Sequence, residues 1–404
     1  MRAVVWHGPG DIRVDTVPDP AILDPFDAVV RITTSAICGT DLHFVRGTMT
    51  GMSEGRVLGH ECVGVVEEVG AGVRNLRPGT RVVVGSTVGC GACSYCRAGH
   101  TSQCDNANPN GKTAGTTFFG GPDPAGGLDG MQAEYVRVPF AHVGAVPLPD
   151  EVTDDQAIML SDIYPTAWFG AKAADVRTGD TVAVFGAGPV GQFAVLSAFQ
   201  QGAGRVLVVD GIESRLAAAR ALGGEAVDFN SEDVVEVLRD LTQGAGPDRV
   251  IDAVGVESER AKGGPSADGA DPEQDAKEVA ENVEESGQDG DQWRPGDAPT
   301  QAARWYVDAV AKAGRIGIIG VYPPTMGHFP IGQAMNKNLT ISMGNCPHRR
   351  YIPELLDLVR TGVVDPSTVL TQSEPLVDAV SAYETFDRRE PGWLKVALDL
   401  EARA

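Results

Sequence analysis

Short stretches of alternating apolar and polar residues dominate the first part of the chain. Three of them are DAVVRITTSAI (27–37), RVLGHECVGVVEEVG (56–70) and TRVVVGSTVG (80–89). A period of two is typical of strands with one buried face, and Val, Ile and Thr favour strands. The pattern therefore predicts a β-rich domain over residues 1–161.

From residue 162 onwards, apolar runs alternate with segments of helical periodicity. In chain order these are TVAVFGAGPV (181–190), QFAVLSAFQQ (192–201), RVLVVD (205–210), ESRLAAARALG (213–223), AVDF (226–229), VVEVLRDLTQG (234–244) and RVIDAVG (249–255). Alternating strands and helices indicate a parallel sheet with helices on both faces. We expect a doubly wound α/β domain over residues 162–344.

Residues 257–300 interrupt this alternation with a polar, acidic segment. It holds thirteen acidic and four basic residues and is rich in Gly, Pro and Asp. Such a composition favours a solvated, partly mobile surface loop, with a lid or an assembly contact as alternatives. The α/β pattern resumes with WYVDAVAKAG (305–314), and residues 345–404 end in the strand-like LKVALDL (394–400).

Composition and charge narrow the class of protein. The chain has 404 residues, enough for two domains, and its 42% hydrophobic and 22% charged residues are ordinary for a globular protein. No apolar run approaches the length of a membrane span, and the N-terminus lacks a signal-peptide pattern, so a cytoplasmic location is expected. A net charge of −22 without a basic patch argues against nucleic-acid and membrane-surface partners.

The densest chemical signal is the cysteine-rich segment GCGACSYCRAGHTSQC, residues 89–104. Cys90, Cys93, Cys96 and Cys104 have C-x2-C-x2-C-x7-C spacing, and in a reducing compartment such a cluster favours a metal over disulfides. Four thiolates complete a tetrahedral zinc site and leave no position for a substrate, so this site is expected to be structural. An iron–sulfur cluster and free thiols are the alternatives.

A looser set of metal-ligand residues is spread along the chain. Cys38 lies in ICGTDLH, and His60 and Glu61 lie in LGHECVG. Each is a weak signal alone, but catalytic zinc takes three protein ligands from Cys, His and carboxylate and keeps one position open. Together these residues predict a second, catalytic metal site.

A glycine-rich segment carries the cofactor signal. VFGAGPVGQFAV places Gly186, Gly188 and Gly191 in G-x-G-x-x-G spacing between an apolar strand and a helix. In this context the glycines allow a tight turn, close approach of a pyrophosphate and close packing of the helix on the sheet. Asp210 ends the next strand, where its carboxylate would accept hydrogen bonds from ribose hydroxyls and repel a 2′-phosphate. NAD is therefore favoured over NADP, although Arg215 is a cation that suits either.

Taken together, these segments resemble the zinc-dependent medium-chain alcohol dehydrogenases. The resemblance runs from CGTDLH through GHECVGVVEEVGAGVRNLRPGTRVVV and the four-cysteine loop to VFGAGPVG, and it spans nearly the whole chain outside 257–300. It implies a GroES-like β-rich catalytic domain (1–161, completed by 345–404) and a Rossmann NAD-binding domain (162–344). The formaldehyde dehydrogenase branch is the most similar, because LSDIYPTAWFG has Asp162 where many relatives have a zinc-binding cysteine.

The resemblance also implies roles around the catalytic zinc. Cys38, His60 and Asp162 would bind the metal, so that a thiolate and a carboxylate balance its charge. Glu61 would lie just behind the metal as a transient ligand. Asp41 would hold the imidazole of His60 in position.

Substrate and cofactor contacts are implied in the same way. Thr40 would take the proton of the substrate hydroxyl and pass it to His43, whose ordinary pKa lies near neutrality. The cofactor contacts of the family match Thr166 and Val190 at the nicotinamide ring, Arg215 at the ribose and Lys395 at the pyrophosphate.

The expected function is reversible oxidation of an alcohol or aldehyde hydrate with NAD, with formaldehyde or a small alcohol favoured. The enzyme would be a homo-oligomer, a dimer or tetramer, with two zinc ions per chain. Alternatives are a dehydrogenase of larger alcohols or aldehydes, a nicotinoprotein that retains its NAD as an aldehyde dismutase or acceptor-dependent alcohol dehydrogenase, and a non-catalytic zinc- and NAD-binding redox sensor. The remaining cysteines and histidines are expected to be structural: Cys62, Cys346, His7, His100, His142, His328 and His348.

Overall fold

The computed structural model describes residues 1–268, 271–283 and 292–402. The chain forms two compact units. The first comprises Met1–Pro165, Glu285–Trp293 and Asn345–Ala404, and the second comprises Thr166–Glu284 and Arg294–Gly344. The sequence-based limits at 161/162 and 344/345 differ from these by a few residues at the first limit, and by the grouping of 285–293 with the first unit.

The first unit is built on antiparallel sheets. Its strands are β1 (Arg2–Gly8), β2 (Asp11–Thr16), β3 (Ala28–Ile37), β4 (Arg56–Val57), β5 (Cys62–Val69), β6 (Arg81–Val84), β7 (Tyr135–Val138), β8 (Ala145–Pro147), β15 (Gln372–Pro375) and β16 (Val396–Asp399). Among the described residues, one sheet has the order β2-β1-β4 and the other the order β15-β16-β3-β5-β6-β8, with β7 also paired to β3. Because β16 pairs with β3, the C-terminal tail completes this unit.

The helices of the first unit include one that is strongly amphipathic. Helices that lie within it are α1 (Gly39–Val45), α2 (Ser94–Arg97), α3 (Ala141–Gly144), α4 (Asp154–Ile158), α13 (His348–Arg360) and α14 (Ala379–Asp387), while α5 (Ile163–Ala173) continues into the second unit. On α13 the buried residues His348, Tyr351, Ile352 and Leu355 follow a three-to-four-residue spacing. This spacing places them on one face of the helix, and that face includes a histidine.

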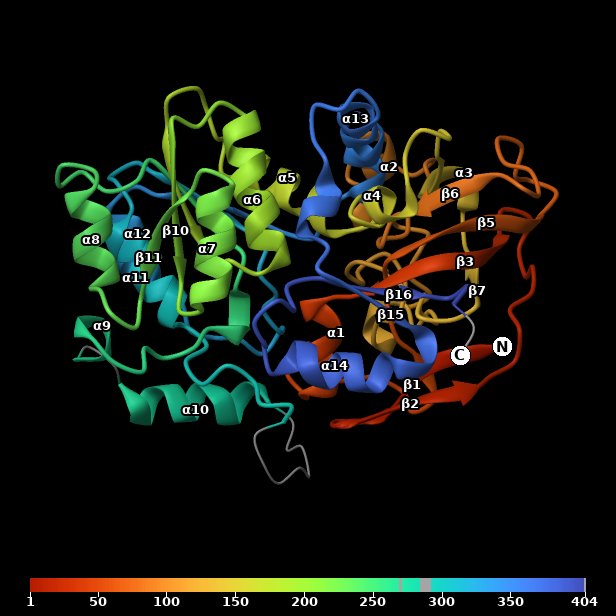
Figure 1. Ribbon diagram of the computed structural model, residues 1–404, viewed down its shortest axis with the longest axis horizontal. Coiled ribbons are helices and arrows are strands. Elements are labelled where there is room, and N and C mark those ends of the chain that lie inside the picture. The colour runs from red at the N-terminus through yellow and green to blue at the C-terminus, as the bar shows by residue number, and fades with distance from the viewer. Residues whose placement is uncertain (269–270, 284–291, 403–404) are drawn as a thin grey trace. The chain divides into compact units, whose positions relative to one another are not determined.

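The second unit is the doubly wound parallel sheet that the sequence predicts (Figure 1). Its strands are β9 (Thr181–Phe185), β10 (Arg205–Asp210), β11 (Glu225–Asp228), β12 (Arg249–Asp252), β13 (Arg315–Ile318) and β14 (Thr340–Met343). They pair in parallel in the order β11-β10-β9-β12-β13-β14. Its main helices are α6 (Pro189–Gln200), α7 (Glu213–Ala221), α8 (Val234–Asp240), α11 (Gln301–Ala309) and α12 (Ile331–Asn336). Strands β9 and β10 are almost fully buried, which explains why their sequences are continuously apolar.

The acidic segment 257–300 is more structured than its composition predicts. It contains α9 (Pro265–Asp268) and α10 (Pro272–Asn282). Asp275 on α10 is fully buried, and its two carboxylate oxygens accept hydrogen bonds from Arg260 and Arg304. The surface-loop prediction is therefore wrong for this part, because ion pairs of a buried aspartate with two partly exposed arginines hold a segment that has few apolar side chains. Residues 269–270 and 284–291 of the segment lie outside the described residues.

Candidate functional site

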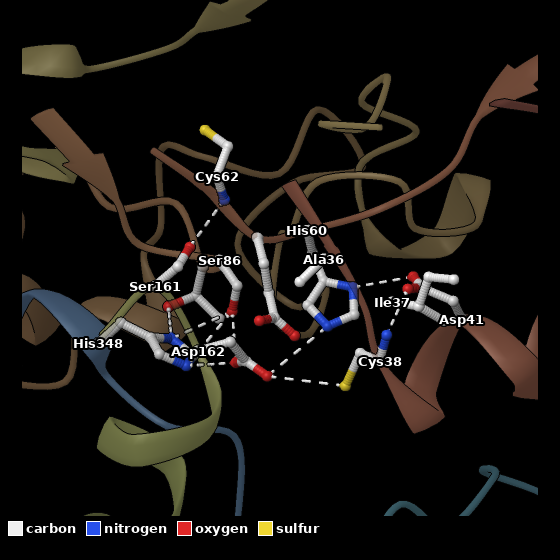
Figure 2. A network of polar contacts seen from close by, with 12 residues as sticks. Ala36, Ile37, Cys38, Asp41, His60, Cys62, Ser86, Ser161, Asp162 and His348 are labelled. Atoms are coloured by element: carbon white, nitrogen blue, oxygen red, sulfur yellow. Dashed lines mark hydrogen bonds and ion pairs between the residues drawn. The ribbon is translucent and has the colours of Figure 1, made fainter. Parts of the chain in front are cut away.

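Side chains from three distant parts of the sequence converge in the first unit. Cys38, His60, Glu61 and Asp162 are all buried, and one ligand atom from each lies within 4.8 Å of the others. Cys38 follows the end of β3, whereas His60 and Glu61 directly precede β5. Since Ser35 of β3 pairs with Cys62 of β5, strand pairing brings these two chain segments together. The turn between α4 and α5 adds Asp162 (Figure 2).

The spacing of these groups fits a bound metal ion. The Oδ2 atom of Asp162 lies 3.9 Å from the Sγ atom of Cys38 and 3.6 Å from the Nε2 atom of His60. A tetrahedral zinc ion places its ligand atoms about 3.4–3.8 Å apart, close to these values. Burial raises the pKa of the Cys38 thiol, so the thiolate that metal binding requires needs a cation beside it. The donor set therefore fits the zinc implied by the sequence.

Asp41 connects two of these side chains. Its Oδ1 atom lies 3.1 Å from the Nδ1 atom of His60, and its Oδ2 atom accepts a 2.9 Å hydrogen bond from the backbone N–H of Cys38. Gln132 also donates to Oδ2, and the hydroxyl of Tyr383 donates to Gln132 in turn. This buried network holds the Asp41 carboxylate beside Nδ1 of His60, which leaves Nε2 directed toward the metal position. That Asp41 orients the imidazole stays a prediction.

Glu61 has a buried cationic partner, Lys395, which the family resemblance places at the cofactor pyrophosphate instead. The ammonium of Lys395 donates to Glu61 Oε1 at 2.6 Å and to the carbonyl oxygen of Ile37 at 3.0 Å. Both charged side chains are 0% exposed. Burial lowers the pKa of Lys395, but the Glu61 carboxylate, together with the negative charges of Cys38 and Asp162, outweighs this effect and raises the pKa above its ordinary value. The prediction that Lys395 faces the cofactor pyrophosphate is corrected here, because this side chain is enclosed in the first unit and bonded to Glu61.

The second oxygen of Asp162 reveals two residues that the sequence did not indicate. Asp162 Oδ1 lies 2.6 Å from the Nε2 atom of His348 and accepts a 2.9 Å hydrogen bond from the hydroxyl of Ser86. Burial alone would raise the pKa of Asp162, but the hydrogen bond from His348, together with the neighbouring His60, outweighs this effect and holds the pKa well below its ordinary value. Asp162 is therefore ionised, as a metal ligand must be.

The two residues proposed for proton transfer lie on α1, next to Cys38. Thr40 is half-buried in its first turn, and His43 is buried with Nδ1 2.8 Å from the hydroxyl of Thr48. His43 is thus not a surface histidine. Their transfer role stays a prediction.

The four-cysteine loop forms the second cluster of the first unit. Cys90, Cys93, Cys96 and Cys104 offer sulfur atoms within 4.8 Å of one another, and all seven cysteines are free thiols. Burial raises the pKa of Cys90, but N–H groups of Ala92 and Cys93 that point at its sulfur outweigh this and hold it at about 7. The amide of Asn106 also donates to this sulfur, at 3.2 Å. These donors favour the thiolate of Cys90, the form that a structural zinc requires of a cysteine. Burial raises the pKa of Cys96 and Cys104, so their thiolates need the metal ion beside them.

In the second unit, the glycine-rich turn has the geometry that a dinucleotide requires. Gly186 has a φ of +91°, and a Cβ at this position would overlap Val254. A Cβ on Gly191 would overlap the carbonyl oxygen of Gly186, so the helix α6 packs on the turn only with glycine there. Gly188 precedes the first turn of α6, whose N–H groups are suited to a phosphate.

Asp210 closes the same turn from the end of β10. Its carboxylate accepts hydrogen bonds from the N–H groups of Ala187 (2.7 Å), Gly211 (2.8 Å) and Ile212 (2.9 Å). Asp210 is therefore fixed against the glycine-rich turn, where the sequence predicts a ribose. Arg215, Thr166 and Val190 are all half-buried, and their cofactor contacts stay predictions.

A mixed Cys, His and Asp metal site, a four-cysteine metal site and a dinucleotide-binding turn define a zinc- and nicotinamide-dependent oxidoreductase. Family models match residues 24–150 as the alcohol dehydrogenase GroES-like domain and residues 189–261 as zinc-binding dehydrogenase. No helix in the described ranges is long and apolar enough to cross a membrane.

Individual relatives agree with this class. The chain is 36% identical over 402 residues to the uncharacterized zinc-type alcohol dehydrogenase-like protein AdhB of Bacillus subtilis (strain 168), with 98% of this chain and 100% of that protein covered. It is 40% identical over 268 residues to the glutathione-independent formaldehyde dehydrogenase of Pseudomonas aeruginosa (strain LESB58), covering 64% of this chain and 66% of that one. Among solved structures, alcohol dehydrogenase TADH from Thermus sp. ATN1 matches with a TM-score of 0.79 and 33% identity over 99% of both chains.

The chain belongs to the zinc-type alcohol dehydrogenases. Its general activity is accordingly NAD-dependent oxidation of an alcohol, and its cofactors are zinc and NAD. The GroES-like and Rossmann-type architecture predicted from the sequence is confirmed.

Proposed function

We propose that this protein oxidises a small primary alcohol or the hydrate of a small aldehyde, with formaldehyde the favoured aldehyde. The observation that carries the proposal is the carboxylate of Asp162 beside Cys38 and His60 in the candidate metal site. When bound, zinc supplies a Lewis acid for the substrate oxygen and NAD supplies the hydride acceptor. An oxygen ligand in place of a second sulfur leaves the metal more electron-poor than a site with two thiolates.

The residues of this chain have separate tasks in that reaction. Cys38 and Asp162 contribute two negative charges that balance a divalent ion, and His60 contributes a neutral donor whose orientation Asp41 holds. Thr40 accepts a hydrogen bond from the substrate hydroxyl and, as it takes that proton, gives up its own toward the cofactor ribose, so that His43 is the final proton acceptor. For this pair we expect His43→Gln to lower kcat most on the acidic side of the pH profile, because the relay then lacks its terminal base.

Binding of NAD falls to the second unit. Asp210 accepts hydrogen bonds from the adenosine ribose, and Arg215 contacts the same ribose. Thr166 and Val190 contact the nicotinamide ring. Asp210→Ser is expected to reduce the preference for NAD over NADP, because it removes the charge that repels a 2′-phosphate. Titration of both cofactors into this variant and the parent protein tests this assignment.

One structural feature favours a nicotinoprotein as the second candidate. The acidic segment follows β12 directly, at the carboxyl edge of the sheet where cofactors bind in this fold. Its start is bonded to α11 through the hydrogen bond from Ala302 N–H to Ser258, and to its own later part through the hydrogen bond from Gly296 N–H to Glu257. An anchored segment at this edge would slow NAD release. Native mass spectrometry after desalting separates the candidates, since retained NAD mass supports the nicotinoprotein and its loss supports the exchanging dehydrogenase.

The deciding experiment for the substrate is a panel assayed with added NAD. It covers formaldehyde, short-chain, long-chain and aromatic alcohols, each with and without glutathione. We expect the highest kcat/KM for formaldehyde or a small alcohol and no change with glutathione. A preference for long-chain or aromatic alcohols would contradict the proposal while leaving the family assignment intact.

We also propose that the chain forms a homo-oligomer. Three large apolar side chains near the edge strand β14 are exposed: Ile331 (68%), Met335 (80%) and Met343 (64%). Edge strands with exposed apolar side chains pair readily with another chain. Analytical ultracentrifugation of the parent protein and of Met343→Lys tests this, and a monomeric parent protein would contradict it.

A further inference from the structure

The two oxygens of Asp162 face different partners. Oδ2 is directed at Cys38 Sγ and His60 Nε2, the two other candidate metal ligands, at 3.9 and 3.6 Å (Figure 2). Oδ1 is directed the opposite way, 2.6 Å from His348 Nε2 and 2.9 Å from Ser86 Oγ. The carboxylate is thus divided between a metal-facing oxygen and an oxygen that only protein groups contact.

The ring of His348 contacts three polar side chains, those of Asp162, Ser86 and Thr87. Its ring is 2% exposed, and it occupies the first position of α13, whose apolar face anchors the helix in the first unit. Nδ1 lies 3.0 Å from the hydroxyl of Thr87, which in turn donates to the carbonyl oxygen of Cys346 at 3.1 Å. The ring therefore cannot turn away from Asp162 without breaking contacts on its other side.

The chemistry of the contact fixes the direction of the hydrogen bond. An ionised carboxylate only accepts hydrogen bonds, so His348 must carry a proton on Nε2 and donate it to Asp162 Oδ1. A cysteine at position 162 has a single side-chain heteroatom, so no separate acceptor atom would face His348 while the sulfur binds the metal. The histidine is therefore matched to an aspartate ligand in particular.

We propose that His348 is a positioning residue that holds Asp162 as a one-oxygen metal ligand, with Ser86 as a second donor to the same oxygen. The proposal rests on the proposed function in one respect, namely that Asp162 binds the catalytic zinc. It adds a residue that neither the sequence motifs nor the ligand set indicates. Partners that orient metal ligands typically change metal affinity about 10–100-fold when they are removed.

The first test is the rate at which a chromophoric chelator removes zinc from the whole protein. Asp162→Ala identifies the phase that belongs to the catalytic site, because the four-cysteine site is untouched in that variant. We expect His348→Ala to accelerate this phase about 10–100-fold and to leave the slower phase unchanged. His348→Gln, whose side-chain amide can still donate, should release zinc at a rate between those of the parent protein and His348→Ala. The matched control is His328→Gln in the second unit, where the histidine side chain is 40% exposed, and it should match the parent protein.

A double-variant cycle separates positioning from general damage to the fold. In Asp162→Cys the ligand has no second oxygen, so adding His348→Ala should change the zinc release rate less than about twofold, against the 10–100-fold effect in the parent background. The cobalt-substituted proteins give a second readout. The absorption spectrum of His348→Ala should differ from that of the parent protein, whereas Asp162→Cys with and without the histidine should give the same spectrum.

The outcomes distinguish this inference from the proposed function. If Asp162→Ala retains two zinc ions per chain, the ligand assignment fails and the positioning role fails with it. If Asp162→Ala loses one zinc but His348→Ala releases zinc at the parental rate, the positioning role alone is overturned. Equal acceleration by His348→Ala in the aspartate and cysteine backgrounds would also overturn it, because the histidine would then act on the fold rather than on the carboxylate.

Discussion

Replacing Lys395 by methionine tests whether this residue serves the fold or the cofactor. Its ammonium lies 2.6 Å from Glu61, with both side chains 0% exposed. In Lys395→Met the carboxylate of Glu61 stays buried but loses its partner, and its Oε2 atom has no hydrogen bond among the described residues in the first place. The carbonyl oxygen of Ile37 loses a donor as well.

The size of the effect follows from these contacts. Removing one partner of a buried ion pair costs about 3–5 kcal/mol of unfolding free energy, because an uncompensated charge remains inside. At roughly 2–4 °C per kcal/mol for a unit of this size, the melting temperature should fall by about 6–20 °C. Adding Glu61→Gln removes the stranded charge, so the double variant should recover most of the loss.

The assay combines thermal unfolding with NAD titration by fluorescence. The matched control is Lys262→Met, since Lys262 is 79% exposed and should leave both values unchanged. We expect Lys395→Met to bind NAD within about twofold of the parent protein at a temperature where both are folded, a difference well below the tenfold that 1.4 kcal/mol represents. An unchanged melting temperature with a large loss of NAD affinity would contradict this prediction and would support a contact between Lys395 and the cofactor pyrophosphate.

Three further predictions concern other parts of the chain. Gly191→Ala should destabilise the second unit by about 1–3 kcal/mol and weaken NAD binding, because the added methyl group overlaps the Gly186 carbonyl; denaturant unfolding and NAD titration measure this, and parental values would contradict the tight packing. Cys96→Ser should reduce the zinc content from two ions to one and lower the melting temperature, whereas metal analysis showing two ions would exclude the four-sulfur site. Burial raises the pKa of Asp252, even though backbone N–H groups and Tyr322 donate to it. A raised pKa means that the folded state favours protonated Asp252, so the parent protein loses stability as the pH rises and this group ionises. The stability of Asp252→Asn relative to the parent protein should therefore increase from low to neutral pH. A difference that does not depend on pH would argue against a buried charge at this position.

The spacing of neighbouring residues in the sequence was sufficient to predict the four-cysteine metal site and the glycine-rich cofactor turn. The four cysteines lie within one short loop, and the glycines lie within one strand-turn-helix, so neighbouring residues alone determine their geometry. Asp210 was predictable for the same reason, because it ends the strand next to the turn. The doubly wound sheet likewise follows from the alternation of apolar strands and helices along the chain.

The other features of the candidate site depend on tertiary contacts, which local sequence patterns do not show. Cys38, His60 and Asp162 meet only because β3 pairs with β5 and the turn before α5 packs beside them, so the family resemblance rather than periodicity predicted this set. His348 was missed, although its place on the apolar face of α13 marks it as a polar residue on a buried surface. Nothing near Lys395 in the sequence reveals its partner, since Glu61 directly precedes β5 in a distant part of the chain.

The acidic segment was misjudged for a related reason. Its composition lacks the apolar residues that usually build a core, and polar segments of this kind are commonly solvated. Ion pairs of the buried Asp275 with the partly exposed Arg260 and Arg304 replace apolar packing there, and such pairs join residues that sequence patterns do not connect.

The most direct test of the metal-site assignment is X-ray diffraction from crystals of the zinc-loaded protein at the zinc absorption edge. The account predicts two anomalous peaks per chain, one among Cys38 Sγ, His60 Nε2 and Asp162 Oδ2, and the other among the sulfur atoms of the four-cysteine loop. A single peak in the four-cysteine loop, or a first peak that Asp162 does not contact, would contradict it.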